Sequence, residues 1–169
     1  YSPYSTPTLA SLDEEKKFST IINGSYFART EGGNYHAGLL WLDGIRQTPF
    51  VSDDPQLTHI LCLAGWRISL IENALYISED SLKSCILAVQ AGPLVYESQD
   101  GLVRENLVPK TYIGSAHTRT VLVVFTRPDN SQDVWFLTFY TKMTLAQVRD
   151  VVLSETRFYD TYKNIQILN

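Results

Sequence analysis

The sequence has 169 residues, of which 44% are hydrophobic, and this is enough apolar material for the core of one globular domain. Fourteen Lys and Arg stand against 18 Asp and Glu, and the basic residues are scattered along the chain, which argues against a nucleic-acid-binding groove. No segment approaches the roughly 18 consecutive apolar residues of a membrane-spanning helix.

The first third of the chain predicts an arm, a helix and strands. Residues 1–9 predict an irregular arm, and residues 9–18, with acidic residues first and basic residues last, favour a short helix. A strand over 21–27 is interrupted by Asn23-Gly24. Residues 38–45 predict a strand that closes on an Asp43-Gly44 hairpin turn.

Further strands are expected over 57–63 and 66–71, followed by an apolar run over 81–89 that ends at Gly92-Pro93. Residues 99–109 predict a loop. Residues 119–126 and 134–141 are apolar at successive positions, which is typical of central strands covered on both faces. The turn residues Pro128–Ser131 predict that the two strands form a hairpin.

A capping box at Thr144–Gln147 predicts a helix over 145–155, and residues 165–169 alternate as a strand. Together the elements predict a single-domain α+β fold with a mixed, mostly antiparallel central sheet and a few flanking helices.

Cys62 and Cys85 lie in apolar segments and lack the spacing of metal ligands. Because buried thiols are common in such segments, the sequence favours two free thiols in the core, with a disulfide as the alternative.

Asn23-Gly24 lies between apolar strand residues and has several interpretations. Both residues tolerate a positive φ, so the pair fits a bulge or a tight turn. Asn23-Gly24-Ser25 is also a glycosylation acceptor sequence in a eukaryotic secretory protein. An Asn side chain at a strand end can alternatively donate hydrogen bonds to a ligand.

Arg119 directly precedes the apolar run 121–125, and a guanidinium at the start of a buried strand needs an anionic partner. That partner is either a structural carboxylate or a bound substrate. His117 is a surface imidazole, a phosphate contact or a proton donor. Gly92-Pro93 ends a strand in the structural interpretation, and in the functional one Gly92 forms a wall of the site.

The three phrases that contain Asn23-Gly24, Gly92-Pro93 and His117-Thr118-Arg119-Thr120 occur in an order and spacing that resembles the phosphodiester glycosidase family. This family is found in bacterial exopolysaccharide proteins and in the lysosomal uncovering enzyme. The resemblance covers residues 10–169 and ends at Asn169, where the family continues into an Asp-Gly-Gly segment. It therefore predicts such a domain over 10–169 without its C-terminal Asp-Gly-Gly segment.

The resemblance implies hydrolysis of a sugar-1-phosphodiester in a phosphorylated sugar or polysaccharide by a secreted or periplasmic protein. It implies that Arg119 grips the phosphate with its bidentate fork and that Asn23 donates from its amide. Glu31 and Asp43 are the candidate carboxylates for activating water, although acidic loop residues are usually solvated. The implied substrate-binding residues are Gly24, Tyr26, Gly92, His117, Thr118 and Asn169.

No metal-ligand spacing, phosphate loop or dinucleotide fingerprint occurs, so no metal or cofactor is expected. Two other functions fit the same sequence. One is a non-catalytic module that binds carbohydrate or phosphate on this scaffold, and the other is an interaction domain whose exposed Trp and Tyr mark a partner surface.

Overall fold

The computed structural model describes residues 27–30, 33–52, 54, 56–72, 77–99, 102–105, 115–154 and 161–169. The predicted arm at 1–9, the predicted helix over 9–18 and the strand residues 21–26 lie outside the described residues.

The described strands pair antiparallel throughout, in two five-stranded sheets and one two-stranded ribbon. The first sheet has the order β4-β3-β7-β5-β6, with bounds β3 (Leu40–Leu42), β4 (Ile45–Thr48), β5 (His59–Ala64), β6 (Arg67–Glu72) and β7 (Leu87–Ala91). The second sheet has the order β11-β10-β12-β8-β9, with bounds β8 (Leu94–Gln99), β9 (Leu102–Glu105), β10 (His117–Thr126), β11 (Gln132–Met143) and β12 (Asn164–Leu168). The ribbon is formed by β1 (Phe27–Thr30) and β2 (Gly33–His36).

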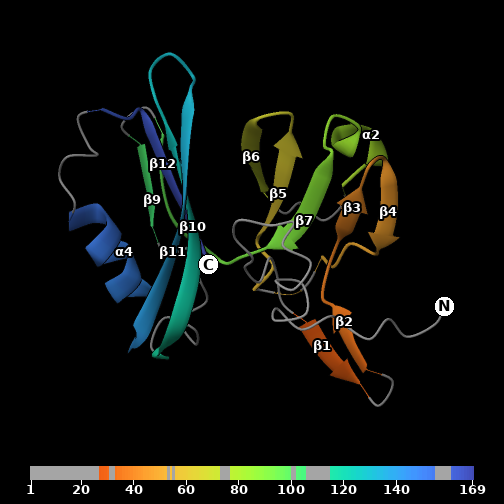
Figure 1. Ribbon diagram of the computed structural model, residues 1–169, viewed down its shortest axis with the longest axis horizontal. Coiled ribbons are helices and arrows are strands. Elements are labelled where there is room, and N and C mark those ends of the chain that lie inside the picture. The colour runs from red at the N-terminus through yellow and green to blue at the C-terminus, as the bar shows by residue number, and fades with distance from the viewer. Residues whose placement is uncertain are drawn as a thin grey trace, which may run out of the picture.

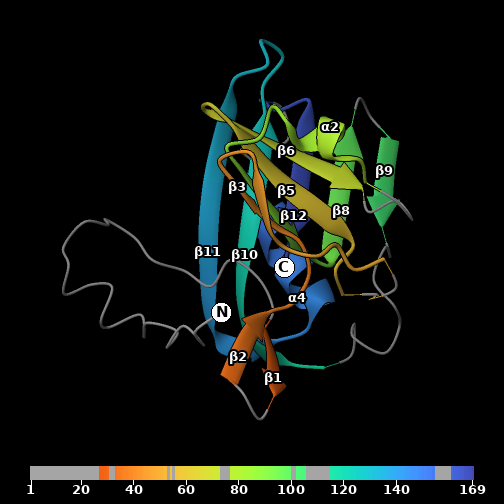
Figure 2. The same cartoon turned by 90° about the vertical axis from the view of Figure 1, so that its right-hand side faces the viewer.

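The two sheets lie face to face, with a helix on the outer side of each (Figure 1). Helix α4 (Leu145–Ser154) covers the second sheet, and the short helix α2 (Glu79–Leu82) lies against the first. Seen through the first sheet, its strands run obliquely to the long strands β10 and β11 behind it (Figure 2). The α+β class and the mostly antiparallel pairing are confirmed, but the strands form two sheets instead of one central sheet.

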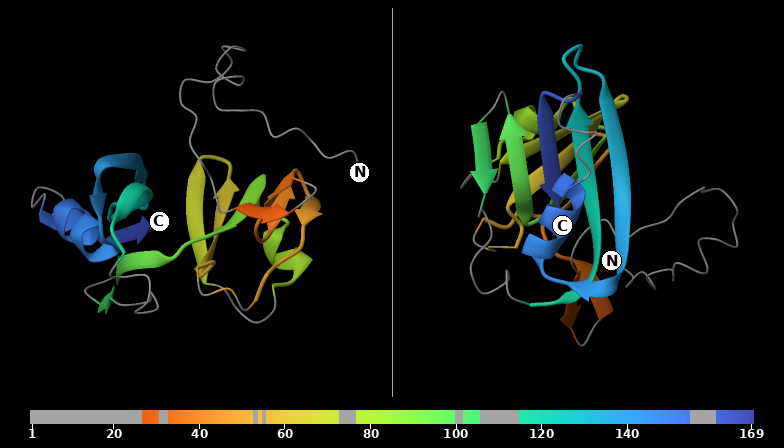
Figure 3. Two further views of the ribbon diagram at one scale, coloured as in Figure 1. Left: turned by 90° about the horizontal axis from the view of Figure 1, so that it is seen from below. Right: turned by 90° about the vertical axis from the view of Figure 1, so that its left-hand side faces the viewer.

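The chain crosses between the sheets at Gly92-Pro93, and Figure 3 shows this segment passing from β7 to β8. A second connection between the two sheets lies at the β6 edge. There the Gln132 side chain accepts a hydrogen bond from Ile68 N at 2.9 Å and donates one to Ile68 O at 2.8 Å. The amide of Gln132 thus pairs with β6 as a neighbouring strand would, and this fixes the second sheet against the first.

The predicted hairpin at Asp43-Gly44 is confirmed, since β3 and β4 are joined by these two residues with φ values of 48° and 82°. Positive φ at both positions gives the twist that a two-residue hairpin needs. The prediction of a loop over 99–109 is wrong for residues 102–105, which pair with β8 as strand β9. Period-two patterning is weak there because the strand is only four residues long at the sheet edge.

The prediction that 134–141 is a central strand covered on both faces is wrong, although the strand and its hairpin with β10 are confirmed. Among the strands that the structure describes, β11 lies at the sheet edge, and its Phe136 and Tyr140 are 49% and 89% exposed. Strand β10, between β11 and β12, is buried over 121–126 as expected. Aromatic residues occur in edge strands and in central strands alike, so the composition of residues 134–141 could not show that this strand lies at the sheet edge.

The predicted helix over 145–155 is confirmed as α4. Gln147 N donates to Thr144 Oγ1 at 3.2 Å, and Thr144 N donates to Gln147 Oε1 at 2.9 Å, which is the reciprocal pattern of a capping box. The buried stripe of Leu145, Val148 and Val152 packs on the α4 side of the second sheet.

The preference for free thiols is wrong, because Cys62 and Cys85 form a disulfide with an S–S distance of 1.98 Å. Strand pairing brings Cys62 of β5 and the segment before β7 together, with a Cα–Cα distance of 5.5 Å. Both sulfurs lie in the core beneath α2, where the Trp41 indole donates to Cys85 O at 3.2 Å. Burial was predicted correctly, but the spacing along the chain carried no information on pairing.

Gln90 holds the segment before β3 and the segment after β4 onto β7. Its side chain is fully buried, and its Oε1 accepts from Leu39 N at 2.9 Å and from Val51 N at 3.0 Å. Its amide Nε2 donates to Val51 O. The side chain therefore satisfies backbone groups that would otherwise be buried without partners.

Replacing Gln90 by Leu is expected to lower the free energy of unfolding by about 2–5 kcal/mol, because two buried N–H groups lose their acceptor. Urea denaturation measures this loss. The matched control is Gln47→Leu on the exposed strand β4, which is expected to change stability by less than about 0.5 kcal/mol. Equal losses in the two variants would contradict the role of Gln90.

Asp133 links the start of β11 to the segment before β12. Tyr162 Oη donates to Asp133 Oδ2 at 2.6 Å, and Arg127 Nη2 donates to the same oxygen. The hydrogen bond from Tyr162, followed by that from Arg127, holds the pKa of Asp133 below its ordinary value of 3.8. The Tyr162 ring also packs on Phe125 of the core.

The stabilisation from ionised Asp133 is complete above its ordinary pKa and is lost as the pH falls through the lowered value. We therefore expect Asp133→Asn to flatten the decline of the melting temperature between about pH 5 and pH 2. Tyr162→Phe removes the hydrogen bond that contributes most to the lowered pKa of Asp133, and it should also make the melting temperature depend less steeply on pH. Thermal melts across this pH range provide the measurement, and identical slopes in all three proteins would contradict the assignment.

Candidate functional site

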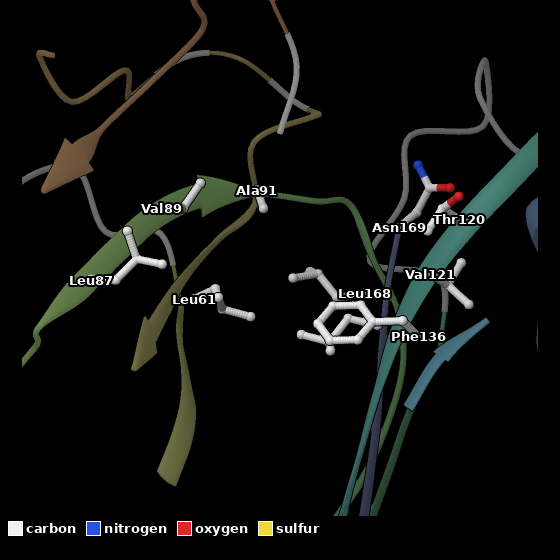
Figure 4. A pocket seen from close by; sticks show the side chains of 10 residues that line it. Leu61, Leu87, Val89, Ala91, Thr120, Val121, Phe136, Leu168 and Asn169 are labelled. Atoms are coloured by element: carbon white, nitrogen blue, oxygen red, sulfur yellow. The ribbon is translucent and has the colours of Figure 1, made fainter. Parts of the chain in front are cut away.

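A cavity of about 220 Å³ lies between the two sheets. Figure 4 shows its lining side chains, and all but two are apolar. The first sheet contributes Leu61, Leu87, Val89 and Ala91, and the second sheet contributes Thr120, Val121, Leu122, Phe136, Leu168 and Asn169. Among the residues that the structure describes, no charged side chain lines the cavity, and its polar side chains are Thr120 and Asn169.

Strand register brings distant parts of the chain into one row beside this cavity. Leu168 of β12 pairs with Leu122 of β10 on one side and with Leu94 of β8 on the other. One position further along, Asn169 N donates to Pro93 O at 3.1 Å. The Gly-Pro connection, the end of β12 and the start of buried β10 therefore meet at the same end of the second sheet.

Gly92 is required at this junction by the close approach of another segment. Its φ is +151°, and a Cβ there would lie 2.4 Å from Gln56 O and 2.8 Å from Thr58 N. The hydroxyl of Thr58 accepts from Leu94 N at 2.8 Å, directly after the crossing. The structure therefore explains Gly92 as the residue that ends β7 where another segment passes close by. Gly92 is not among the described residues that line the cavity, so its predicted role as a wall of the site stays a prediction.

Arg119 lies at the same end of the second sheet, but its side chain does not line the cavity. It pairs with Phe139 and shares the α4 side of the sheet with Val121, because side chains alternate along a strand. Its Nη2 donates to Ser115 O at 2.8 Å and its Nε donates to Met143 O at 3.4 Å. The guanidinium is thus held in place by backbone carbonyl oxygens at the rim of the sheet.

His117 and Thr118 precede Arg119 on β10, and both are exposed. The pairing with β11 shifts register between His117 and Arg119, which marks a bulge. Both residues therefore lie at the rim with Arg119, outside the cavity lining.

Asp43 is not brought to this rim. It occupies the β3–β4 turn, where its N donates to Ile86 O just before β7 begins. Gly92 follows the other end of β7, whose five residues span roughly 16 Å. The remaining predicted site residues, Asn23, Gly24, Tyr26 and Glu31, lie outside the described residues.

The structure adds two polar residues that the sequence interpretation did not select. Thr120 lines the cavity, and its Oγ1 is 3.2 Å from Thr138 Oγ1. His59 is buried, pairs with Ala91, and has its Nδ1 2.9 Å from the Thr58 hydroxyl. Alternation along the predicted strand 57–63 placed His59 on the face of Leu61, and this was the signal available in the sequence.

The residues that the structure describes hold no group of three or more His, Cys, Asp or Glu arranged to bind a metal ion. Within the same ranges, no helix has the length and apolar character required to cross a membrane.

Comparison of the chain with models of protein families, with curated proteins and with solved structures gives no match in any of the three. Its function must therefore be argued from its own residues.

Gly92→Ala is expected to lower the free energy of unfolding by roughly 2 kcal/mol or more, because the new Cβ meets backbone atoms and the backbone is strained. The control is Gly65→Ala in the β5–β6 turn, where φ is +60° and no atom lies within 4 Å of the new Cβ. This control should lose only about 1–2 kcal/mol, from the left-handed conformation. Urea denaturation compares them, and an equal loss would show that the contact with Gln56 does not matter.

Proposed function

We propose that the protein is a glycosidase that hydrolyses a sugar-1-phosphodiester. The observation that carries this proposal is the meeting of three segments that contain residues the family resemblance assigns to a binding site. They are the Gly92-Pro93 connection, the start of β10 and the chain end at Asn169. Pro93 and Asn169 are joined by a hydrogen bond, and Asn169 follows the β12 residue that pairs with β10 just beyond Thr120. These segments are more than 20 residues apart in the sequence, and they end at one rim.

The phosphate is proposed to bind at this rim, beside the start of β10. Arg119 presents a guanidinium whose orientation is restrained by Ser115 O and Met143 O. A restrained guanidinium stabilises the charge that develops on a departing phosphate without first having to reorganise. His117 and Thr118 are exposed next to it and can donate hydrogen bonds to the remaining phosphate oxygens.

The bond that breaks joins the anomeric carbon to a phosphate oxygen, and water supplies the new hydroxyl. A phosphate is a weak base, so its departure needs little help from a general acid. A carboxylate is proposed to take the proton from water. Asp43 lies at the opposite end of β7, which leaves Glu31 as the candidate offered by the sequence.

A secreted or periplasmic location is part of the same proposal. The disulfide between Cys62 and Cys85 supports it, because disulfides form and persist in oxidising compartments.

The test is hydrolysis of methyl N-acetylglucosamine-1-phosphate, with release of the free sugar as the readout. Arg119→Ala is expected to lower kcat/KM by about 10²–10³-fold, and Arg119→Lys should recover only part of this loss because it lacks the bidentate fork. Arg67→Ala, at an exposed position on β6, serves as the control and should retain full activity.

Two results would contradict the proposal. Binding of the diester by the wild type without any turnover would indicate a non-catalytic phosphate- or carbohydrate-binding module. Absence of both binding and turnover would favour an interaction domain. Circular dichroism of each variant excludes loss of folding as the cause.

A further inference from the structure

The cavity between the sheets has a chemistry of its own. Its lining is mostly apolar on both sides, with Leu61 of the first sheet facing Leu168 of the second (Figure 4). A sugar ring requires several hydrogen-bonding partners, and a phosphate requires a cation. The side chains that the structure describes around the cavity offer one hydroxyl, one amide and no charge, so neither group is favoured inside it.

The size of the cavity also matters. The cavity has a volume of about 220 Å³, which exceeds the roughly 150 Å³ that holds a small apolar molecule. It is partly open to solvent at Phe136, and water inside it finds few hydrogen-bonding partners, so an apolar group is the occupant that its lining favours.

The apolar surface continues beyond the cavity along one face of the first sheet. Leu87 lines the cavity and pairs with Leu42 of β3, which in turn pairs with Ile45 of β4. Leu42 is 45% exposed and Ile45 is 63% exposed. Paired residues share a face of the sheet, so the apolar track leads from the cavity to the surface and suits an elongated ligand.

The polar end of the cavity fixes the direction of such a ligand. Thr120 and Asn169 lie at the end of the second sheet where the phosphate is proposed to bind. Thr120 follows Arg119 on β10 and its side chain lies on the opposite face, so the ligand is proposed to pass around this end of the sheet from Arg119 into the cavity. We propose that the cavity binds an alkyl chain esterified to the phosphate, so that the substrate is a sugar-1-phosphate diester of a lipid-like alcohol. This inference rests on the proposed function and specifies the second alcohol of its substrate.

Binding is measured without turnover, through the fluorescence of N-phenyl-1-naphthylamine and its displacement by alkyl phosphates. Octyl phosphate is expected to displace the probe at least 10-fold more effectively than butyl phosphate, because four further methylene groups leave water. Equal potency of the two alkyl phosphates would overturn the proposal.

Val89→Phe fills the cavity and is expected to weaken binding of octyl phosphate at least 10-fold. The matched control is Val151→Phe, the same substitution at an exposed position of α4, and it should bind as the wild type does. Phe136→Ser is a second variant, at a lining residue that is 49% exposed, and it should also weaken binding. Wild-type affinity in both cavity variants would overturn the proposal.

The two proposals fail in distinguishable ways. Hydrolysis of the methyl diester without selective octyl phosphate binding would leave the enzyme function standing and overturn the alkyl site. Selective octyl phosphate binding that Val89→Phe abolishes, in a protein without hydrolytic activity, would support the alkyl site and overturn the enzyme function.

Discussion

The close contact of the Gly92 backbone with the segment at Gln56 and Thr58 is the constraint on which the rest of the structure depends. Only a residue without Cβ allows the chain to leave β7 at this distance from a neighbouring backbone. After the crossing, Leu94 pairs with Leu168, and Asn169 N donates a hydrogen bond to Pro93 O. The facing of the two sheets, the cavity between them and the proposed phosphate site all follow from this junction.

The proposed phosphate site at the rim and the cavity behind it differ in chemistry, since the first presents a charged side chain and the second is mostly apolar. Arg119 and the exposed start of β10 lie where water reaches them, so a charged phosphate can bind there without full desolvation. The aliphatic space behind Thr120 excludes charge and accepts only a group that water does not retain. A ligand that occupies both regions must be amphiphilic, with its charged end at the rim and its apolar end in the cavity.

Local patterns in the sequence were enough to predict the Asp43-Gly44 hairpin, the β10–β11 hairpin and the capping box of α4, because each depends on residues close together in the chain. Features set by distant partners were missed. The Cys62–Cys85 bond and the edge position of β11 depend on which strands become neighbours. The local sequence of one strand does not determine its neighbours in the sheet. For the candidate site, the sequence selected Gly92, Arg119 and Asn169, but it gave no indication that Asn169 would form a hydrogen bond with Pro93.

Each five-stranded sheet is built from one uninterrupted stretch of the chain, residues 40–91 for the first and 94–168 for the second. Most strand partners are therefore near one another in sequence, and either half can assemble its hydrogen bonds before the other is complete. During synthesis the first half can be fully paired while the second is still emerging. Until the second sheet has formed, Leu61, Ile68 and Leu70 of the first sheet lack the residues against which they pack in the finished protein. Transiently exposed apolar surface of this kind is what chaperones bind, so the two-sheet design gives the nascent chain a stage at which it is prone to aggregate.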